Sequence, residues 1–405
     1  MQPSNTELIL IRVTGEDRPG LTASVTEILA KYDATILDIG QADIHNTLSL
    51  GILFRSEERH SGFIMKELLF KASSLGVTIR FEPIGTDQYE NWVGMQGKNR
   101  YILTVLGRKL SARQISAATR VLAEQDLNID AIKRLTGRIP LDEDKTDTRT
   151  RACIEFSVRG TPKDRIAMQE RLMQLASEQE MDFSFQQDNM YRRMRRLICF
   201  DMDSTLIETE LAIRAGVGDE VKAITESAMR GEIDFTESFT RRVALLKGLD
   251  ESVMQEIAES LPITEGVDRL MYVLKKYGYK IAILSGGFTY FGQYLQKKYG
   301  IDYVYANELE IVDGKLTGRY LGDVVDGKRK AELLRLIAQV EKVDIAQTIA
   351  VGDGANDLPM LGIAGLGIAF HAKPKVVANA KQSINTIGLD GVLYFLGFKD
   401  SYLNM

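Results

Sequence analysis

Several residue types that enzymes often use are scarce in this chain of 405 residues. It contains three histidines, His45, His60 and His371, and two cysteines, Cys153 and Cys199. The histidines do not cluster, and neither cysteine has the spacing of a metal ligand, so a zinc site or a histidine-based triad is not expected. Both cysteines lie inside apolar runs, and we expect them to be reduced packing residues.

Long apolar runs and an excess of basic charge are also absent. No stretch is long enough to span a bilayer, and residues 1–7 lack the basic and apolar segments of a signal peptide, so a cytoplasmic protein is predicted. The net charge of -5 argues against nucleic-acid binding, and the basic cluster at residues 192–196 is expected to be a solvated connector. The remaining composition, 44% hydrophobic and 26% charged, is typical of a globular protein with two or three domains.

The N-terminal half contains the same pattern twice. In the first copy, apolar periodicity predicts a strand, a helix, two strands, a helix and a strand, at residues 7–13, 21–32, 35–44, 47–55, 63–75 and 77–81. After a polar connector around residues 87–99, the same order returns at residues 100–185. This is the order of a ferredoxin-like βαββαβ unit, so two such domains are predicted.

From Leu197 the pattern changes to strands separated by longer helical stretches, which is typical of an α/β fold. Three apolar strands end in polar turns. Residues 197–200 precede Asp201 and Asp203, residues 280–284 precede Ser285 and Gly286, and residues 348–351 precede Asp353, Asn356 and Asp357. In a parallel sheet these ends lie at one edge, so a shared crevice is predicted. Residues 210–262 are predicted to be a helical insertion that caps the sheet.

The predicted crevice has the composition of a phosphoryl-transfer site. Carboxylates without histidine or cysteine neighbours favour a hard cation such as Mg²⁺. Ser285 and the glycine amides after it suit a small anion, and Lys330 adds a positive charge. One of Asp201 and Asp203 would attack phosphorus, and the other would transfer protons. The spacing of the two aspartates leaves open which one attacks.

These turns resemble the four motifs of the haloacid dehalogenase (HAD) superfamily. The motifs are Asp201-Met202-Asp203-Ser204-Thr205, Ser285-Gly286-Gly287, Lys330 and Gly352-Asp353-Gly354-Ala355-Asn356-Asp357. The resemblance implies a Rossmann-like parallel sheet with a cap, Asp201 as nucleophile and Asp203 as acid/base, with Lys330 as a further catalytic residue. It also implies that Mg²⁺ is held by Asp201, Asp353 and the backbone carbonyl of Asp203, with Asp357 as an outer ligand or orienting residue.

Within this superfamily the chain resembles the phosphoserine phosphatases. The resemblance rests on Glu210, the run from Met229-Arg230-Gly231 to Phe235, Arg242 and Ser285-Gly286-Gly287-Phe288. It implies that Glu210 binds the substrate ammonium and Arg242 its carboxylate, while Ser285, Gly286, Lys330 and Asn356 bind the phosphate. The implied activity is Mg²⁺-dependent hydrolysis of O-phospho-L-serine through an aspartyl-phosphate, the last step of L-serine biosynthesis.

The two N-terminal units resemble ACT domains, a regulatory module that commonly binds amino acids. The resemblance rests on Asp17-Arg18-Pro19-Gly20, and Asp17 and Gly20 are the predicted ligand residues, with L-serine or another amino acid as the expected ligand. The second unit has Gly107-Arg108-Lys109 at this turn and lacks the Pro-Gly pair. ACT units often pair between chains, which predicts a homodimer. The predicted domains are residues 1–86, 99–187 and 188–405.

Two other interpretations remain open. A phosphatase of the same mechanism would act on another small phosphomonoester or pass phosphate to an alcohol. A protein of another class, an amino-acid sensor, would carry an inactive catalytic half. The pair Asp201 and Asp203 argues against the sensor, because two close carboxylates are costly to keep without a function.

Overall fold

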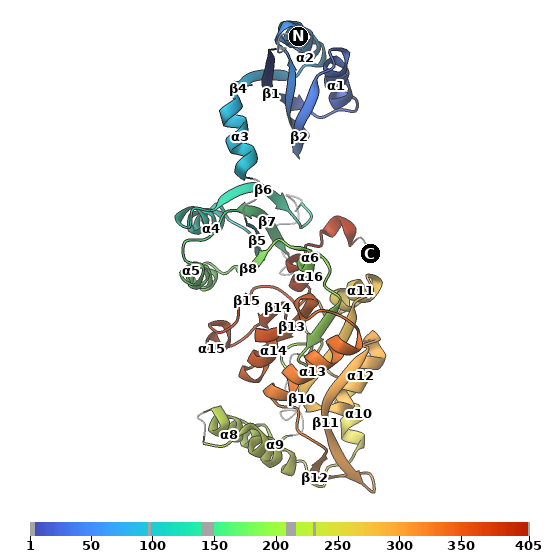
Figure 1. Cartoon of the computed structure of the whole chain (residues 1–405). Coiled ribbons are helices and arrows are strands. Elements are labelled where there is room, and N and C mark those ends of the chain that lie inside the picture. The colour runs from blue at the N-terminus through green and yellow to red at the C-terminus, as the bar shows by residue number, and fades with distance from the viewer. Residues whose placement is uncertain (1–4, 96–98, 139–149, 208–215, 230–231, 404–405) are drawn as a thin grey trace. The chain divides into compact units, whose positions relative to one another are not determined.

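The structure is a computed structural model that describes residues 5–95, 99–138, 150–207, 216–229 and 232–403. Its contacts divide the chain into two compact units, Met1–Lys98 and Asn99–Met405 (Figure 1). Each unit is built around its own sheet. Among the helices described, none has both the length and the apolar character needed to cross a membrane.

The first unit is an antiparallel sheet in the order β2-β3-β1-β4, with two helices packed on one face. Its elements are β1 (Thr6–Glu16), α1 (Leu21–Lys31), β2 (Thr35–Ile44), β3 (Thr47–Glu57), α2 (Glu58–Leu75) and β4 (Thr78–Ile84). Ile9, Ile11 and Val13 of β1 are buried against the helices, because strand side chains alternate between the two faces of a sheet. The predicted ferredoxin-like order is confirmed for this unit.

Two helix predictions in this unit were wrong. Helix α2 begins at Glu58 and not at residue 63, because its first turn is polar and does not continue the apolar periodicity. A helix, α3 (Thr86–Gly94), lies where a polar connector was predicted. None of the side chains of α3 is buried, so the sequence offers no apolar stripe that would indicate a helix there.

The second unit is built on a sheet of eleven strands in the order β12-β11-β10-β9-β13-β14-β15-β8-β5-β7-β6. The last four strands form an antiparallel, ferredoxin-like part with α4 and α5: β5 (Arg100–Gly107), α4 (Ala112–Glu124), β6 (Asn128–Arg134), β7 (Ala152–Arg159), α5 (Arg165–Glu178) and β8 (Asp182–Gln187). The two parts of the sheet join where β15 pairs with β8, at Ser383 and Phe183. The boundary at residues 187 and 188 therefore falls within a continuous sheet and stays a prediction.

The other part of this sheet is parallel from β11 to β15 and carries the expected α/β architecture. Its strands are β9 (Leu197–Phe200), β10 (Lys280–Phe288), β11 (Tyr303–Val312), β12 (Lys315–Leu321), β13 (Thr348–Gly352), β14 (Leu366–Phe370) and β15 (Gln382–Ile384). Its principal helices are α8 (Gly218–Met229), α9 (Phe235–Ala244), α10 (Ser252–Glu259), α11 (Val267–Lys276), α12 (Thr289–Tyr299), α13 (Gly327–Val340), α14 (Leu358–Ile363) and α16 (Gly391–Phe395). The predicted fold class, an α/β sheet preceded by two ferredoxin-like units, is confirmed.

Strand β9 lies at the centre of the parallel part and is buried on both faces. Leu197 and Cys199 pack toward α13 and α14, whereas Ile198 and Phe200 pack toward α11 and α12. Burial raises the pKa of the Cys199 thiol, which fits the packing role predicted for it. A strand covered by helices on both faces reads as a continuous apolar run, and this is why its position was predictable.

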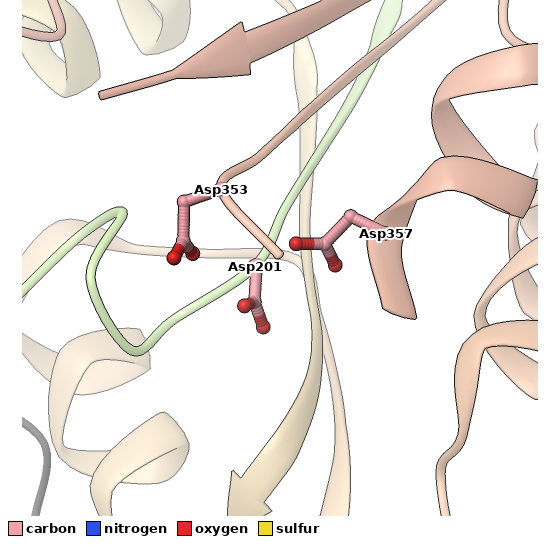
Figure 2. A group of neighbouring side chains, drawn as sticks. All are labelled: Asp201, Asp353 and Asp357. Atoms are coloured by element: carbon pink, nitrogen blue, oxygen red, sulfur yellow. The ribbon is translucent and has the colours of Figure 1, made fainter. Parts of the chain in front are cut away.

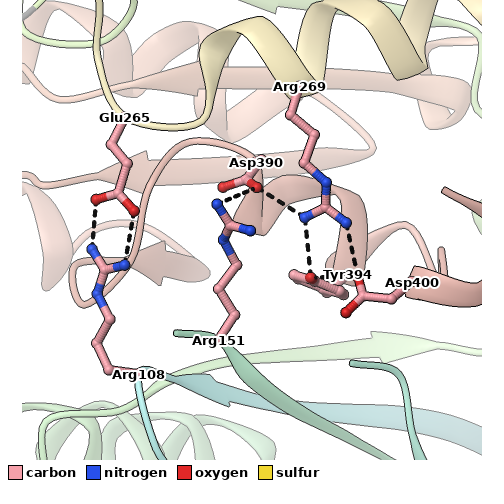
Figure 3. Close-up of polar contacts among 7 residues, drawn as sticks. All are labelled: Arg108, Arg151, Glu265, Arg269, Asp390, Tyr394 and Asp400. Atoms are coloured by element: carbon pink, nitrogen blue, oxygen red, sulfur yellow. Dashed lines mark hydrogen bonds and ion pairs between the residues drawn. The ribbon is translucent and has the colours of Figure 1, made fainter. Parts of the chain in front are cut away.

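Ion pairs, one of them around a buried carboxylate, connect the ferredoxin-like part of the second unit to the parallel part (Figure 3). Arg108 donates two hydrogen bonds to Glu265, of 2.8 and 2.6 Å. The carboxylate of Asp390, whose side chain is 0% exposed, lies 3.0 Å from Arg151 and 3.0 Å from Arg269. A buried carboxylate between two guanidinium groups is well balanced, but each of these groups depends on the others.

The basic cluster at residues 192–196 is not the solvated connector that was predicted. Arg192 and Arg195 are 8% and 4% exposed, and Arg192 lies 2.8 Å from Glu155 of β7. Arg193, Met194 and Arg196 of this group are exposed, and 65% of the Arg193 side chain is accessible to solvent. The segment connects the two parts of the second unit, and two of its four arginines, Arg192 and Arg195, are buried there.

We expect Asp390→Asn to destabilise the second unit by about 3 kcal/mol, because it removes the buried carboxylate that Arg151 and Arg269 share and leaves Arg269 with Asp400 alone. Urea unfolding of the full chain, followed by circular dichroism, measures the change. The matched control is Asp126→Asn, which breaks an exposed pair with Lys163 and is expected to cost less than about 1 kcal/mol. The only tryptophan, Trp92, lies in α3 of the first unit, so its fluorescence transition should not move. Equal effects of the two variants would contradict the prediction.

Candidate active site

Three adjacent parallel strands bring the predicted residues to one edge of the sheet. Strand β9 lies between β10 and β13, with Phe200 paired to Ile283 on one side and to Val351 on the other. The residues that follow these pairs therefore all lie at the carboxyl ends of the three strands, at the same edge of the sheet. Asp201, Ser285 and Asp353 meet there, as the pattern of the sequence predicted.

A buried lysine bridges two of the carboxylates. Lys330 lies in the first turns of α13, and its Nζ is 2.8 Å from Asp201 Oδ1 and 2.6 Å from Asp357 Oδ1. Its side chain is 0% exposed. Burial alone would lower the pKa of Lys330, but the charges of Asp201 and Asp357 outweigh it and raise that pKa. The ammonium group therefore stays charged inside the site.

Three carboxylates form a set that suits a metal ion (Figure 2). One oxygen each from Asp201, Asp353 and Asp357 lies within 4.8 Å of the others. Burial, followed by the charges of Asp201 and Asp357, raises the pKa of Asp353 to about 8. Burial, followed by the charge of Asp201, raises the pKa of Asp357 to about 6. Oxygen ligands of this kind fit a hard divalent cation, which would also relieve the repulsion among them.

Asp203 takes a different position from the three carboxylates. Its Oδ2 lies beside Gly287, where a Cβ atom on that glycine would collide with it. Ser204, the next residue, has a left-handed backbone with φ of 59°, which turns the chain away after the second aspartate. The side chain of Asp203 therefore faces the turn at residues 285–287 and is not one of the grouped metal ligands.

Residues 285–287, called the anion loop below, form the opposite wall of the site. The Oγ atom of Ser285 is buried and accepts a hydrogen bond of 2.9 Å from the Gly287 amide. A Cβ atom on Gly286 would lie 3.0 Å from Phe235 Cζ and 3.9 Å from Asn356 Nδ2. The missing Cβ atom of Gly286 thus lets a cap residue, Phe235, approach the backbone closely, with Asn356 nearby.

The cap contributes Arg242 from helix α9. Its guanidinium lies over the ring of Phe239, 5.9 Å from the ring centre, and its Nε donates to the Ser238 carbonyl at 3.4 Å. Phe239 in turn packs edge to face on Tyr320 of β12, with ring centres 5.2 Å apart. Glu210 and residues 230–231 lie outside the described residues, as does the side chain of Met229, so their predicted roles stay predictions.

Two polar residues near the site were not predicted. Thr205 is fully buried and its hydroxyl donates to Asp353 Oδ1 at 3.4 Å. Asn307, in β11, is 1% exposed and contacts the carbonyls of the anion loop. Thr205 belongs to the first motif, so its proximity was foreseeable. Asn307 lies in β11, about 100 residues after Asp201 along the chain. The sequence offers only one indication of its role, which is a polar amide residue within this strand.

The predicted ligand residues of the first unit lie at the turn before α1. Gly20 has φ of 89°, a left-handed conformation that favours glycine, and its carbonyl accepts from the Ser24 amide at 2.9 Å. Asp17 is exposed, and its backbone amide donates to the Asn46 carbonyl at 2.8 Å. The turn therefore has the predicted shape, while the ligand role of both residues stays a prediction.

Comparisons with known proteins agree with this architecture. Residues 198–362 match the haloacid dehalogenase-like hydrolase family, and residues 7–82 and 100–186 each match an ACT domain family. A phosphoserine phosphatase of Streptomyces coelicolor is 38% identical over 402 residues, covering 98% of this chain and 93% of that protein. The chain belongs to the phosphoserine phosphatase family.

Other relatives support the same assignment. A phosphoserine phosphatase of Mycobacterium tuberculosis is also 38% identical, over 96% of this chain and 93% of its own length. The crystal structure of a probable phosphoserine phosphatase from Vibrio cholerae superposes with a TM-score of 0.56 and 35% identity, covering 73% of this chain and 86% of the other. The family resemblance inferred from the motifs is thus confirmed, both for the ACT domains and for the hydrolase.

The raised pKa values predict that metal binding depends on pH. In the metal-free protein Asp353 keeps its proton below about pH 8, so a bound cation must displace it. We expect the affinity for Mg²⁺ to rise up to about tenfold per pH unit from pH 6 to 8 and to level off above that. Calorimetric titration in two buffers of different ionisation enthalpy should show roughly one proton released per ion at pH 7. An affinity that does not change with pH would contradict the assignment, and Asp353→Asn should remove the proton release.

Proposed function

We propose that this protein hydrolyses O-phospho-L-serine to L-serine and phosphate at the site formed by Asp201, Asp203 and Lys330, as the last step of L-serine biosynthesis. The observation that carries the proposal is the buried contact of Lys330 with Asp201 and Asp357, at the edge of the sheet where the neighbouring strand β10 enters the anion loop. A fixed carboxylate, a neighbouring carboxyl group and an anion-binding wall are the parts that phosphoryl transfer through a covalent intermediate requires.

In the first half-reaction a carboxylate oxygen of Asp201 attacks phosphorus. The bond between phosphorus and the serine oxygen breaks, and Asp203 gives its proton to the departing alkoxide. Lys330 keeps the carboxylate of Asp201 in place, because its Nζ lies 2.8 Å from Oδ1. The products of this step are L-serine and a phosphoryl group bound to Asp201 through an acyl phosphate bond.

In the second half-reaction Asp203, now a carboxylate, takes a proton from water. The water oxygen attacks phosphorus, the bond to Asp201 breaks, and inorganic phosphate leaves. Asp203 suits both steps because it faces the anion loop and is separate from the three grouped carboxylates. Phe235 of the cap, which lies over Gly286, would keep bulk water from the acyl phosphate.

We propose Mg²⁺ as the cation of this site. Asp201, Asp353 and Asp357 would hold it together with the backbone carbonyl of Asp203, and Thr205 would orient Asp353 through its hydroxyl. When bound, the ion would neutralise charge that develops on the phosphoryl oxygens. Asn356, next to Gly286, would contact the same oxygens from the other side.

The cap would select the amino-acid part of the substrate. We assign the carboxylate contact to Arg242, because a guanidinium forms paired hydrogen bonds with a carboxylate and because Phe239 holds this one in place. The ammonium contact is assigned to Glu210. A second candidate, another small phosphomonoester, would not need either contact.

We expect Arg242→Ala to raise the KM for O-phospho-L-serine by roughly 10- to 100-fold, the loss of a charged hydrogen-bonded contact of about 1.5–3 kcal/mol. Turnover of p-nitrophenyl phosphate, which has no carboxylate, should not change. The matched control is the neighbouring Arg241→Ala, which breaks a surface pair with Glu237 and should leave both activities intact. Asp201→Asn supplies the zero-turnover baseline. Equal losses on both substrates would refute the assignment of Arg242, and a wild type inactive on phosphoserine would refute the substrate.

We also propose that L-serine binds the first ACT domain at Asp17 and Gly20, where the left-handed turn leaves the start of α1 open to a carboxylate. Calorimetric titration of the Asp201→Asn protein with L-serine should then give a binding heat that Asp17→Ala abolishes. Lys109→Ala, at the equivalent turn of the second domain, is the control and should preserve the heat. Binding that survives Asp17→Ala would place the ligand elsewhere.

The proposal further includes a homodimer in the cytoplasm, and light scattering of the full chain measures the dimer.

A further inference from the structure

Asn307 occupies an unusual position opposite the anion loop. Strands β10 and β11 pair in regular register up to Leu284 and Tyr305, and pairing resumes at Phe288 and Asn307. Between these two pairs β10 runs four residues along the chain and β11 only two. The extra residues of β10, which include the anion loop, therefore form a bulge. The carbonyls of a bulge lose their partners in the neighbouring strand, and buried carbonyls need other donors.

The side chain of Asn307 supplies those donors. Its Nδ2 lies 2.9 Å from the Gly286 carbonyl and 3.3 Å from the Gly287 carbonyl. Its Oδ1 accepts from the Val325 amide at 2.8 Å. Asn307 is 1% exposed, so all three contacts are made away from water. The amide group of Asn307 thus contacts both the anion loop and the segment before α13.

The consequence concerns the direction of a backbone amide. A trans peptide places the N–H opposite to its carbonyl, so holding the Gly286 carbonyl toward Asn307 turns the Gly287 N–H the other way. That N–H donates to Ser285 Oγ at 2.9 Å, on the side of the loop that faces Asp203. The third contact is with the amide of Val325, the residue before Asp326, which is the N-cap of the helix that carries Lys330.

We infer that Asn307 is a positioning residue for phosphoryl transfer, which orients the amide and hydroxyl of the anion loop and fixes that loop relative to the helix of Lys330. The inference rests on the proposed function, because it assumes that this loop binds the phosphoryl group. Donors that are oriented before the reaction stabilise the charge of the transition state without further rearrangement. Asn307 itself touches neither substrate nor reacting atoms.

The test compares two buried amides that receive the same chemical change. Asn307→Asp removes the donor to the anion loop. Gln186→Glu removes a donor to the Phe395 carbonyl, 2.9 Å from Gln186 Nε2, in the ferredoxin-like part of the second unit. We expect both variants to lower the thermal midpoint. Only Asn307→Asp should lower kcat, by roughly 10²- to 10³-fold, as the loss of one oriented transition-state donor does. Its KM for O-phospho-L-serine should stay near the wild-type value, because the cap contacts are intact.

The pH profile separates positioning from stability. The carboxyl group that Asn307→Asp introduces would, once protonated, again donate a hydrogen bond to the loop, so the activity of this variant relative to wild type should rise as pH falls. A purely structural defect would give a ratio that is independent of pH. If Asn307→Asp does not fold, Asn307→Ser, which also removes the donor to both carbonyls, should show the same loss of kcat.

Three results would overturn the inference: a kcat of Asn307→Asp within about twofold of wild type, an equal loss in Gln186→Glu, or a rise in KM without a change in kcat. The same measurements on p-nitrophenyl phosphate separate this inference from the proposed substrate. If the wild type hydrolyses only p-nitrophenyl phosphate, phosphoserine is not the substrate. The kcat values of wild type, Asn307→Asp and Gln186→Glu can still be compared on p-nitrophenyl phosphate, so the inference about Asn307 is still tested.

Discussion

The contact of one buried ammonium group with two carboxylates is the interaction on which the rest of the site depends. Lys330 could not be fully buried without Asp201 and Asp357, because an unpaired charge in the interior is very costly. The pairing fixes where helix α13 sits on the sheet. When Asp353 is ionised as well, the group has one positive and three negative charges, a net of two negative charges that one divalent cation would balance. Local charge balance thus argues for a metal independently of any family.

The site is also the place where three separate parts of the second unit meet. The sheet supplies the carboxylates, α13 supplies the lysine, and the cap reaches the anion loop through Phe235. The cap contacts the β11–β12 hairpin in the turn after α9, where the Gly248 amide donates to the Leu316 carbonyl at 2.8 Å. The same hairpin carries Asn307 at its base. Strand β11 therefore links the position of the cap to the shape of the anion loop.

The sequence alone predicted most of this arrangement, for a physical reason. Buried parallel strands are short apolar runs, and their carboxyl ends collect polar residues, so the positions of Asp201, Ser285 and Asp353 could be read in order. The roles of Glu210 and Arg242 needed the family resemblance, because nothing local distinguishes them from surface residues. Helix α3 was missed because it buries no side chain.

Contacts between parts of the second unit could not be predicted. Arg192 and Arg195 lie in a run that reads as a solvated connector, and they are buried because two elements distant in sequence close over them. Asn307 compensates for a bulge in the neighbouring strand, and a bulge is a property of pairing that a single strand does not reveal. Such residues depend on the register of one strand against another, which periodicity does not encode.

The continuity of the eleven-stranded sheet has a consequence for how this protein can be divided. Strand β15 is an internal strand, because β14 pairs with it on one side and β8 on the other. Cutting the chain before β9 would remove β8 and leave β15 as an open edge, and it would also strip Asp182, which accepts hydrogen bonds from the Asn385 and Thr386 amides. Open edges recruit other strands and lead to aggregation. The second ACT domain thus protects the β15 edge of the hydrolase sheet, in addition to forming a domain of its own.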